Sequence, residues 1–370
     1  MQVEVISDKS NWLDVRVKWN DLLRKNEKYF NPFLSFEWLY SWWEIFGENK
    51  ELLIITVNNG GALVGIAPLM VSSKTGFNIC EFIGTGRSDY LGFIVDRELR
   101  HAVFSIFFEY LKNRVSLHLI NLRDYYFEPL EIIEAANAVG LKAEAIIGDV
   151  APRVIMPGAW EEYLNTKSRK SRANRKRELR QVESDSEITI SCEKTYKAEL
   201  ISELAQVEAR SWKSERGNPR FRGKGRAFFS AFFERFAELG WLEVWVLRYR
   251  GEALAHSVNF CCDDVTYVYN LAHCQDSEKF VKHRSLGSTL TAFALRESFH
   301  HHRQIYDFLR GDEPYKKLWA SDAVNLAYIQ IWQPRILSML ASLVHFRIRF
   351  WLRKTGFGPR IIKILRGLTP

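Results

Sequence analysis

The chain has 370 residues and a net charge of +8, and 47% of its residues are hydrophobic, 14% aromatic and 26% charged. This composition is globular, supplies enough apolar mass for two cores, and excludes an intrinsically disordered chain. The five cysteines are odd in number and form no Cys-x-x-Cys pair, which argues against a disulfide framework and a structural zinc site, so we expect no bound metal.

The positive charge is concentrated in two segments. Residues 167–180 have a balance of +7 and residues 335–370 a balance of +8, which leaves −7 for the rest of the chain. A protein that coats nucleic acid would be basic over most of its surface. The distribution therefore disfavours nucleic acid as a general partner and predicts two local basic surfaces.

The N-terminal sequence alternates polar and apolar residues and has neither the basic start nor the apolar run of a secretory signal. No run reaches the roughly 18 apolar residues that a membrane-spanning helix requires. We therefore expect a cytoplasmic protein, either free or peripheral at the inner face of the membrane.

The first region of the chain predicts alternating strands and helices. Its clearest helix covers residues 35–46, where Ser35 is a suitable N-cap and Gly47 follows the last turn. A hairpin is predicted over residues 52–57 and 62–71, and two further strands over residues 115–122 and 141–147. A helix is predicted over residues 129–139.

The second region has a similar order of elements. The predicted helices cover residues 160–182, 197–213, 226–239 and 286–300. The predicted strands cover residues 241–249, 252–261, 265–272 and 304–309. The two regions look like distant copies of one α/β design, so we predict domains over residues 1–155 and 156–334. A basic amphipathic helical tail, residues 335–370, is expected to follow them.

A candidate cofactor-binding turn lies between the predicted strand 265–272 and the helix that follows. Consecutive backbone N–H groups at a helix start bind pyrophosphate without needing side chains. We assign this role to Arg284, Leu286, Gly287 and Ser288, where Gly287 would allow a phosphate to approach closely. A helix start with a purely structural role would have a similar composition.

This order of elements and this turn resemble the GNAT superfamily, whose phosphate turn reads Arg/Gln-x-x-Gly-x-Gly/Ala. Arg284 and Gly287 match that pattern, whereas Thr289 departs from it. Residues 31–47 and 307–319 (DFLRGDEPYKKLW) resemble the acetyltransferases associated with bacterial cellulose and exopolysaccharide biosynthesis, which look like relatives of the Fem-type transferases. The resemblance implies an α/β (α+β) fold with two GNAT-like domains side by side, each a mixed sheet flanked by helices. It also implies transfer from acetyl-CoA or another acyl-CoA.

Acyl transfer needs a base for the nucleophile, donors for the developing oxyanion and an acid for the leaving thiolate. Asp307 or Glu313 could be the base, and Tyr315 could protonate or hold the sulfur. Lys316 could pair with a phosphate or an acidic acceptor, and we group Arg310 with it as substrate-binding. The structural alternative is an ion pair between Asp307 and Arg310, with Tyr315 packed under the loop.

The acceptor is expected to contact the Gly- and Arg-rich loop over residues 214–225. Arg216 and Arg222 in this loop and Trp212 just before it suit an anionic or sugar-like acceptor. His256 on an apolar strand faces the same region. A solvated loop and a core histidine are the structural alternatives.

Each basic segment has two interpretations. The helix 160–182 is either a solvated helix docked along one edge or a patch for RNA or anionic acceptors. The tail either lies on an anionic membrane surface or docks on the domain.

The leading hypothesis is an acyl-CoA-dependent transferase that acts on an amine or hydroxyl of an envelope- or polysaccharide-related acceptor, a small molecule or a glycan. A Fem-like transferase that takes an aminoacyl group from tRNA is the first alternative. A non-catalytic, membrane-associated assembly factor on the same fold is the second.

Overall fold

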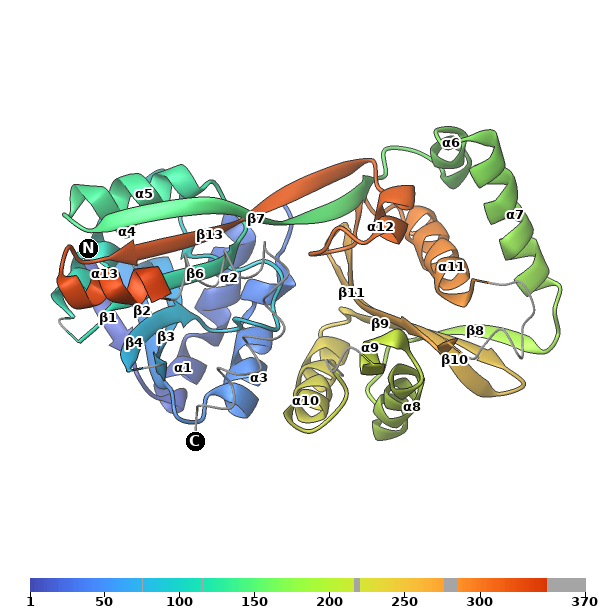
Figure 1. Ribbon diagram of the computed structural model, residues 1–370, viewed down its shortest axis with the longest axis horizontal. Coiled ribbons are helices and arrows are strands. Elements are labelled where there is room, and N and C mark those ends of the chain that lie inside the picture. Colours follow the sequence, from blue (N-terminus) through green and yellow to red (C-terminus); the bar gives the residue numbers. More distant parts are fainter. Residues whose placement is uncertain (75, 115, 216–219, 276–284, 345–370) are drawn as a thin grey trace. The chain divides into compact units, whose positions relative to one another are not determined.

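Figure 1 shows the computed structural model of the chain, which describes residues 1–344 except 75, 115, 216–219 and 276–284. The chain forms two compact units that do not follow its linear order. Unit 1 contains residues 1–26, 49–148 and 326–344, and unit 2 contains residues 27–48 and 149–325, apart from the residues that are not described. No helix within the described ranges is long and apolar enough to cross a membrane.

Unit 1 is built on a mixed sheet in which β4 and β6 are parallel and the other described neighbours are antiparallel. Its strands are β1 (Gln2–Ile6), β2 (Glu51–Asn59), β3 (Ala62–Lys74), β4 (Phe77–Phe82), β5 (Ile94–Val95) and β6 (Leu119–Tyr125). Its helices are α1 (Lys9–Asp14), α2 (Arg16–Asn26), η2 (Arg97–Leu99), α4 (Arg100–Asn113), α5 (Pro129–Ala138) and α13 (Ile336–Ser342). Two strands, β7 (Lys142–Ile155) and β13 (Asp322–Trp332), run from one unit into the other.

The hairpin predicted in the first region is confirmed. β2 and β3 pair up to Asn59 and Ala62. Gly60 and Gly61 between them have φ angles of 58° and 84°, which favour glycine and suit a tight two-residue turn.

Unit 2 contains a second mixed sheet with the order β7, β12, β11, β10, β9, β8. Its strands are β8 (Ile188–Glu193), β9 (Leu242–Tyr249), β10 (Glu252–Cys262), β11 (Val265–His273) and β12 (Ile305–Asp307), joined by the end of β7. Its helices are η1 (Pro32–Leu34), α3 (Phe36–Phe46), α6 (Trp160–Asn165), α7 (Arg169–Glu183), α8 (Ala198–Ala209), α9 (Trp212–Glu215), α10 (Lys224–Glu238), α11 (Leu286–His300) and α12 (Pro314–Trp319). The predicted succession of three antiparallel strands, a helix and a strand is confirmed in β9, β10, β11, α11 and β12.

Two different layers cover the faces of the unit 2 sheet (Figure 1). On one face, which we call the α11 face, Leu295 and Phe299 of α11 belong to an apolar cluster with Trp160 of α6 and Trp319 of α12. On the other, the α10 face, aromatic side chains of α10 pack on the sheet, as the Phe232 and Phe260 rings do at 5.6 Å.

The segment before β2 belongs to unit 2 because of long-range aromatic packing. Ser35 caps α3 as predicted, its hydroxyl accepting a hydrogen bond from Trp38 N at 3.2 Å. The buried Trp38 ring lies 5.0 Å from Phe228 and 4.8 Å from Phe232 of α10. The compact units therefore differ from the linear division at residues 155 and 334.

The single helix expected over residues 160–182 is wrong, because the chain forms two helices there. α6 ends at Asn165, and Ser168 starts α7 by accepting a hydrogen bond from Ser171 N at 3.2 Å. The hydroxyl of Thr166 donates to Tyr163 O at 2.7 Å and so satisfies a carbonyl at the end of α6. Serine and threonine side chains thus cap both sides of the break.

Candidate functional site

The candidate site lies where β11 and β12 separate. These strands run parallel over three residue pairs only, the last being Tyr267 and Asp307. β11 then continues to His273, while the chain after β12 turns toward β7, where Phe308 N donates to Pro152 O at 3.0 Å. Most of the residues predicted to be functional lie at the end of β12, in the loop 308–313, in α12 or at the start of α11.

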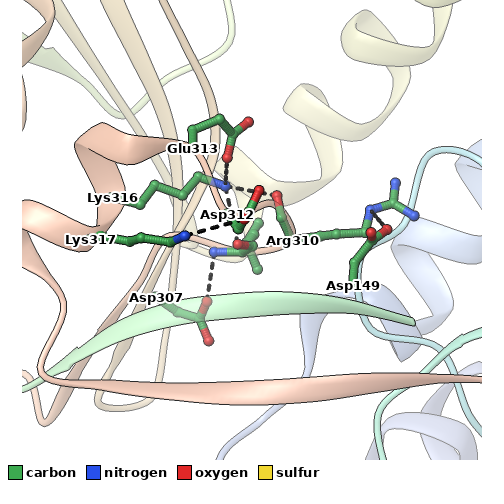
Figure 2. A network of polar contacts seen from close by, with 8 residues as sticks. Asp149, Asp307, Arg310, Asp312, Glu313, Lys316 and Lys317 are labelled. Atoms are coloured by element: carbon green, nitrogen blue, oxygen red, sulfur yellow. Dashed lines mark hydrogen bonds and ion pairs between the residues drawn. The ribbon is translucent and has the colours of Figure 1, made fainter. Parts of the chain in front are cut away.

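The loop after β12 is held from inside by Lys316 (Figure 2). Its buried ammonium donates to Leu309 O at 3.2 Å and Arg310 O at 2.7 Å, and it lies 2.9 Å from Glu313 Oε2. Asp307 Oδ1 accepts from Leu309 N at 2.7 Å. The Lys316 ammonium therefore bonds two loop carbonyl groups and pairs with a carboxylate, and together with Asp307 it shapes the loop.

Arg310 and Glu313, also predicted from the sequence, lie on the outer side of this loop. Arg310 Nε is 3.9 Å from Asp149 Oδ2, and Glu313 is partly exposed beside Lys316. Exposed ion pairs of this kind contribute little to stability. The loop therefore depends on Lys316 more than on Arg310.

Tyr315 points into the apolar cluster of the α11 face. Its ring lies 6.3 Å from Phe308 at an angle of 90°, and it packs against the cluster that contains Trp319. Burial, reinforced by Glu313, raises the pKa of the Tyr315 phenol. The hydroxyl therefore stays protonated at neutral pH and can donate a proton.

The start of α11 offers backbone N–H groups. Ser285 precedes the helix without a side-chain cap, and Thr289 N makes the first bond of the helix, to Ser285 O at 2.9 Å. The N–H groups of Leu286, Gly287 and Ser288 therefore belong to the first turn, which has no intrahelical acceptors for them. A Cβ on Gly287 would lie 2.8 Å from the His273 ring, so glycine here also allows His273 to pack.

One arginine connects three helices at this point, although nothing in the basic run 167–180 distinguishes it from its neighbours. Arg175 of α7 donates to the Ser288 hydroxyl and lies 2.7 Å from Glu178. Its guanidinium also stacks over the Trp319 ring at 4.4 Å. The first turn of α11 and the end of α12 therefore lie beside each other, and a cation lies next to both.

Two buried donor atoms occur on the same face of the sheet. Ser257 pairs with Trp245 across β9 and β10, and its hydroxyl donates to Asn259 Oδ1 at 2.8 Å. Trp245 Nε1 and Asn259 Nδ2 have no hydrogen-bond partner among the described residues. Asn259 pairs with Val268, which belongs to the apolar cluster of the α11 face. These donors suit a polar ligand atom on that face.

A second polar group lies on the α10 face. Lys213 of α9 donates to Asn270 Oδ1, and Asn270 Nδ2 donates to Glu208 Oε1 at 3.5 Å. Glu208 Oε2 accepts from Phe221 N at 2.8 Å. Burial, with repulsion from Arg220, lowers the pKa of Lys213 to about 7. The amine is therefore partly neutral near physiological pH.

His256 lies on the same face and is fully buried. Its ring meets Phe221 edge-on at 5.6 Å, and neither ring nitrogen has a hydrogen-bond partner in the part of the chain that the structure describes. Burial, with a smaller effect of Lys213, lowers the pKa of His256 to about 3. The side chain is therefore neutral.

The remaining predicted residues are spread along the chain around α9 and α10. Trp212 begins α9 and is partly buried, and Arg222 is exposed just before α10. Arg216 and Arg284 lie outside the described residues. Within the described ranges, no cluster of three or more His, Cys, Asp or Glu side chains could hold a metal ion.

Residues 169–317 match a family model described as "Acetyltransferase (GNAT) domain". The fold resembles FemX, with a TM-score of 0.62 and 12% identity over 89% of this chain and 97% of that chain. It also resembles a conserved protein of unknown function from Bacteroides thetaiotaomicron (TM-score 0.56, 11% identity, 90% and 100% covered) and L-PGS from Bacillus licheniformis (0.50, 12%, 85% and 95%). No curated protein matches the chain. The expected mixed α/β fold is confirmed, and the match to the GNAT family model covers residues 169–317.

Proposed function

We propose that unit 2 transfers an acetyl or other acyl group from acyl-CoA to an amine or a hydroxyl. The observation that carries this proposal is the first turn of α11, where the N–H groups of Leu286, Gly287 and Ser288 lie beside Arg175. Backbone amides at a helix start and a guanidinium complement a pyrophosphate. This turn lies within the segment that matches the GNAT family model.

The side chains on the α11 face suit a thioester donor. Trp245 Nε1 and Asn259 Nδ2 are buried donors without a partner among the described residues, and such donors stabilise a carbonyl oxygen as it gains negative charge. Tyr315, kept protonated by burial, can give its proton to the leaving thiolate. Asp307 and Lys316 hold the loop that positions Tyr315.

The acceptor is an envelope- or polysaccharide-related small molecule or glycan, as the resemblance of residues 31–47 and 307–319 implies.

The exposed face of α13 supports work at a membrane surface. Large apolar side chains point outward there, with Ile336 79% and Met339 57% exposed, whereas Ala341 is buried. Outward apolar residues beside a basic segment suit an anionic interface. Flotation with phosphatidylglycerol vesicles should carry the protein, and Ile336→Ser with Met339→Ser should reduce the bound fraction.

Calorimetry with a panel of acyl-CoAs tests the donor assignment. Arg175→Ala should weaken binding about 10- to 100-fold, because one or two charge-assisted hydrogen bonds to the pyrophosphate are lost. Lys176→Ala is the matched control, since Lys176 is exposed on the same helix, and should bind like the wild type. Failure of every acyl-CoA to bind the wild-type chain contradicts the proposal.

A second candidate, transfer of an aminoacyl group from tRNA, is favoured by the surface of α7. Five exposed cations of this helix make no ion pair with any other described residue. They are Arg169, Lys170, Lys176, Arg177 and Arg180. Such a helix suits a phosphate backbone. tRNA binding that weakens steeply with salt and is lost in Lys176→Glu with Arg177→Glu, without acyl-CoA binding, would support this candidate. Absence of both ligands would favour a non-catalytic assembly factor.

A further inference from the structure

A bulge in β11 turns a polar side chain toward the α10 face. Val258 pairs with Asn270 and Asn259 with Val268, so one extra residue, Tyr269, lies between the two pairs. Tyr269 packs against Phe229 at 5.8 Å, and Asn270 contacts Lys213 and Glu208 on the same face. Bulges commonly re-aim a side chain beside an active site. This one lies just beyond the last pair that joins β11 to β12, where the strands separate.

The contacts in this polar group fix the direction of the Lys213 amine. Phe221 N donates to Glu208, which in turn accepts the amide hydrogen of Asn270. Because the amide nitrogen of Asn270 faces Glu208, its carbonyl oxygen faces Lys213 and accepts from Nζ. Glu208 and Asn270 are each 1% exposed. Two buried residues therefore position the amine of Lys213, a residue that is partly exposed as a whole.

The charges around Lys213 come from several elements. Glu208 of α8 and Glu313 before α12 favour its ammonium, whereas Arg220 and Lys316 oppose it. His256 of β10 faces the same group and is neutral. The influence of Glu313 and Lys316 brings the loop after β12 into electrostatic range of the amine. Lys213 also contacts Asn270, three residues after Tyr267, which pairs with Asp307 at the start of the candidate catalytic loop.

We propose that Lys213 is the proton acceptor for the incoming nucleophile, on a site that Glu208 and Asn270 position on the α10 face. The inference rests on the acyl transfer proposed above and assigns its acceptor side. The acceptor is a primary amine or a hydroxyl that reaches the thioester from the α10 face, while the donor lies on the α11 face.

In this step the neutral Nζ takes a proton from the acceptor nitrogen or oxygen as that atom bonds to the thioester carbonyl carbon. The carbon–sulfur bond then breaks, and the sulfur takes the proton of Tyr315. Lys213 releases its extra proton to solvent, and Tyr315 regains one, so atoms and charge balance. Asp307 and Glu313 are less suited to act as the base, because Asp307 accepts a hydrogen bond from Leu309 N and Glu313 pairs with Lys316.

Competitive labelling with acetic anhydride over a range of pH, read by mass spectrometry, tests the state of Lys213 in the full chain without any substrate. Labelling of Lys213 should rise with a midpoint near pH 7, well below the ordinary lysine pKa of about 10.4. Lys197, an exposed lysine of unit 2, is labelled in the same sample as the control for the reagent. A Lys213 midpoint at about 10.4 would overturn the proposal. This result does not depend on whether acyl-CoA is the donor.

The kinetic test compares Lys213→Met and Lys213→Arg with the control Lys197→Met. Loss of a general base should lower kcat by about 10²- to 10⁴-fold. It should also abolish the acidic limb of the pH profile near pH 7, with acyl-CoA affinity unchanged. Lys213→Arg should be as slow as Lys213→Met, because arginine stays protonated. Rescue by arginine would indicate a structural cation and would contradict the proposal, as would a full rate in Lys213→Met.

Discussion

The two faces of the unit 2 sheet carry different chemistry on the same strands. The α11 face offers first-turn amides, a guanidinium from Arg175 and neutral donors such as Asn259. The α10 face places ionisable side chains, Lys213 and His256, among aromatic rings, where burial lowers the pKa of both. Fixed dipoles and a permanent cation suit an anionic ligand, whereas shifted pKa values suit proton transfer. The two faces of one sheet therefore offer groups suited to different tasks, anion binding on the α11 face and proton transfer on the α10 face.

The largest effect is expected from breaking the aromatic layer of the α10 face. Trp38→Ala should lower the free energy of unfolding by about 3–5 kcal/mol, because it removes a fully buried ring that packs on α10. Urea denaturation measures this change. Trp212→Ala, which alters a partly exposed ring, should cost far less, and equal losses for the two variants would mean that the α10 face is not a tight core.

Arg175→Ala should weaken ligand binding on the α11 face and leave the chemistry of the α10 face unchanged. Acyl-CoA binding should weaken about 10- to 100-fold, while the labelling midpoint of Lys213 stays near pH 7. Calorimetry and labelling on the same preparation give both values. A shift of the Lys213 midpoint in this variant would show that the two faces are coupled and would contradict their separate roles.

His256 should make the wild-type protein sensitive to acid. Its pKa is 6.5 in an unfolded chain and about 3 when folded, so between these values the unfolded state binds more protons than the folded state. Stability therefore falls as pH drops from 6.5 toward 3. Between pH 8 and pH 5, His256→Leu should gain about 2 kcal/mol relative to the wild type. If the free energies of unfolding of His256→Leu and the wild type differ by the same amount at pH 8 and at pH 5, the neutral, buried state of His256 is contradicted.

The smallest effect is expected at the outer side of the loop after β12. Arg310→Ala removes a partly exposed pair with Asp149 and should change stability by about 0–1 kcal/mol. Lys316→Met should cost clearly more, since it leaves Leu309 O and Arg310 O without their buried donor. Thermal unfolding of both variants provides the measurement, and a larger loss for Arg310→Ala would reverse the account of this loop.

Local signals in the sequence predicted much of unit 2. Alternating apolar residues and turn residues defined β9, β10 and β11, and the serine and glycine start of α11 was placed correctly. Ser35 was recognised as an N-cap because capping depends on residues three positions apart. The membership of α3 in unit 2 was not predictable, because it rests on contacts between Trp38 and rings about 190 residues later in the chain.

The chemistry was harder to predict for the same reason. Arg175 is one of eight basic residues in 167–180, and only tertiary packing distinguishes it from its neighbours. Lys213 follows Trp212 directly, yet its lowered pKa depends on burial and on a bulge that turns Asn270 toward it. Lys316 was expected at a substrate, whereas its ammonium holds loop carbonyl groups. A single sequence carries no signal for such long-range contacts.

Co-crystallisation of the full chain with coenzyme A tests the central claim most directly. The account predicts that pyrophosphate oxygens lie within hydrogen-bond distance of the N–H groups of Leu286 to Ser288, with Arg175 turned toward them. A pyrophosphate bound on unit 1, or on the α10 face of unit 2, would contradict it.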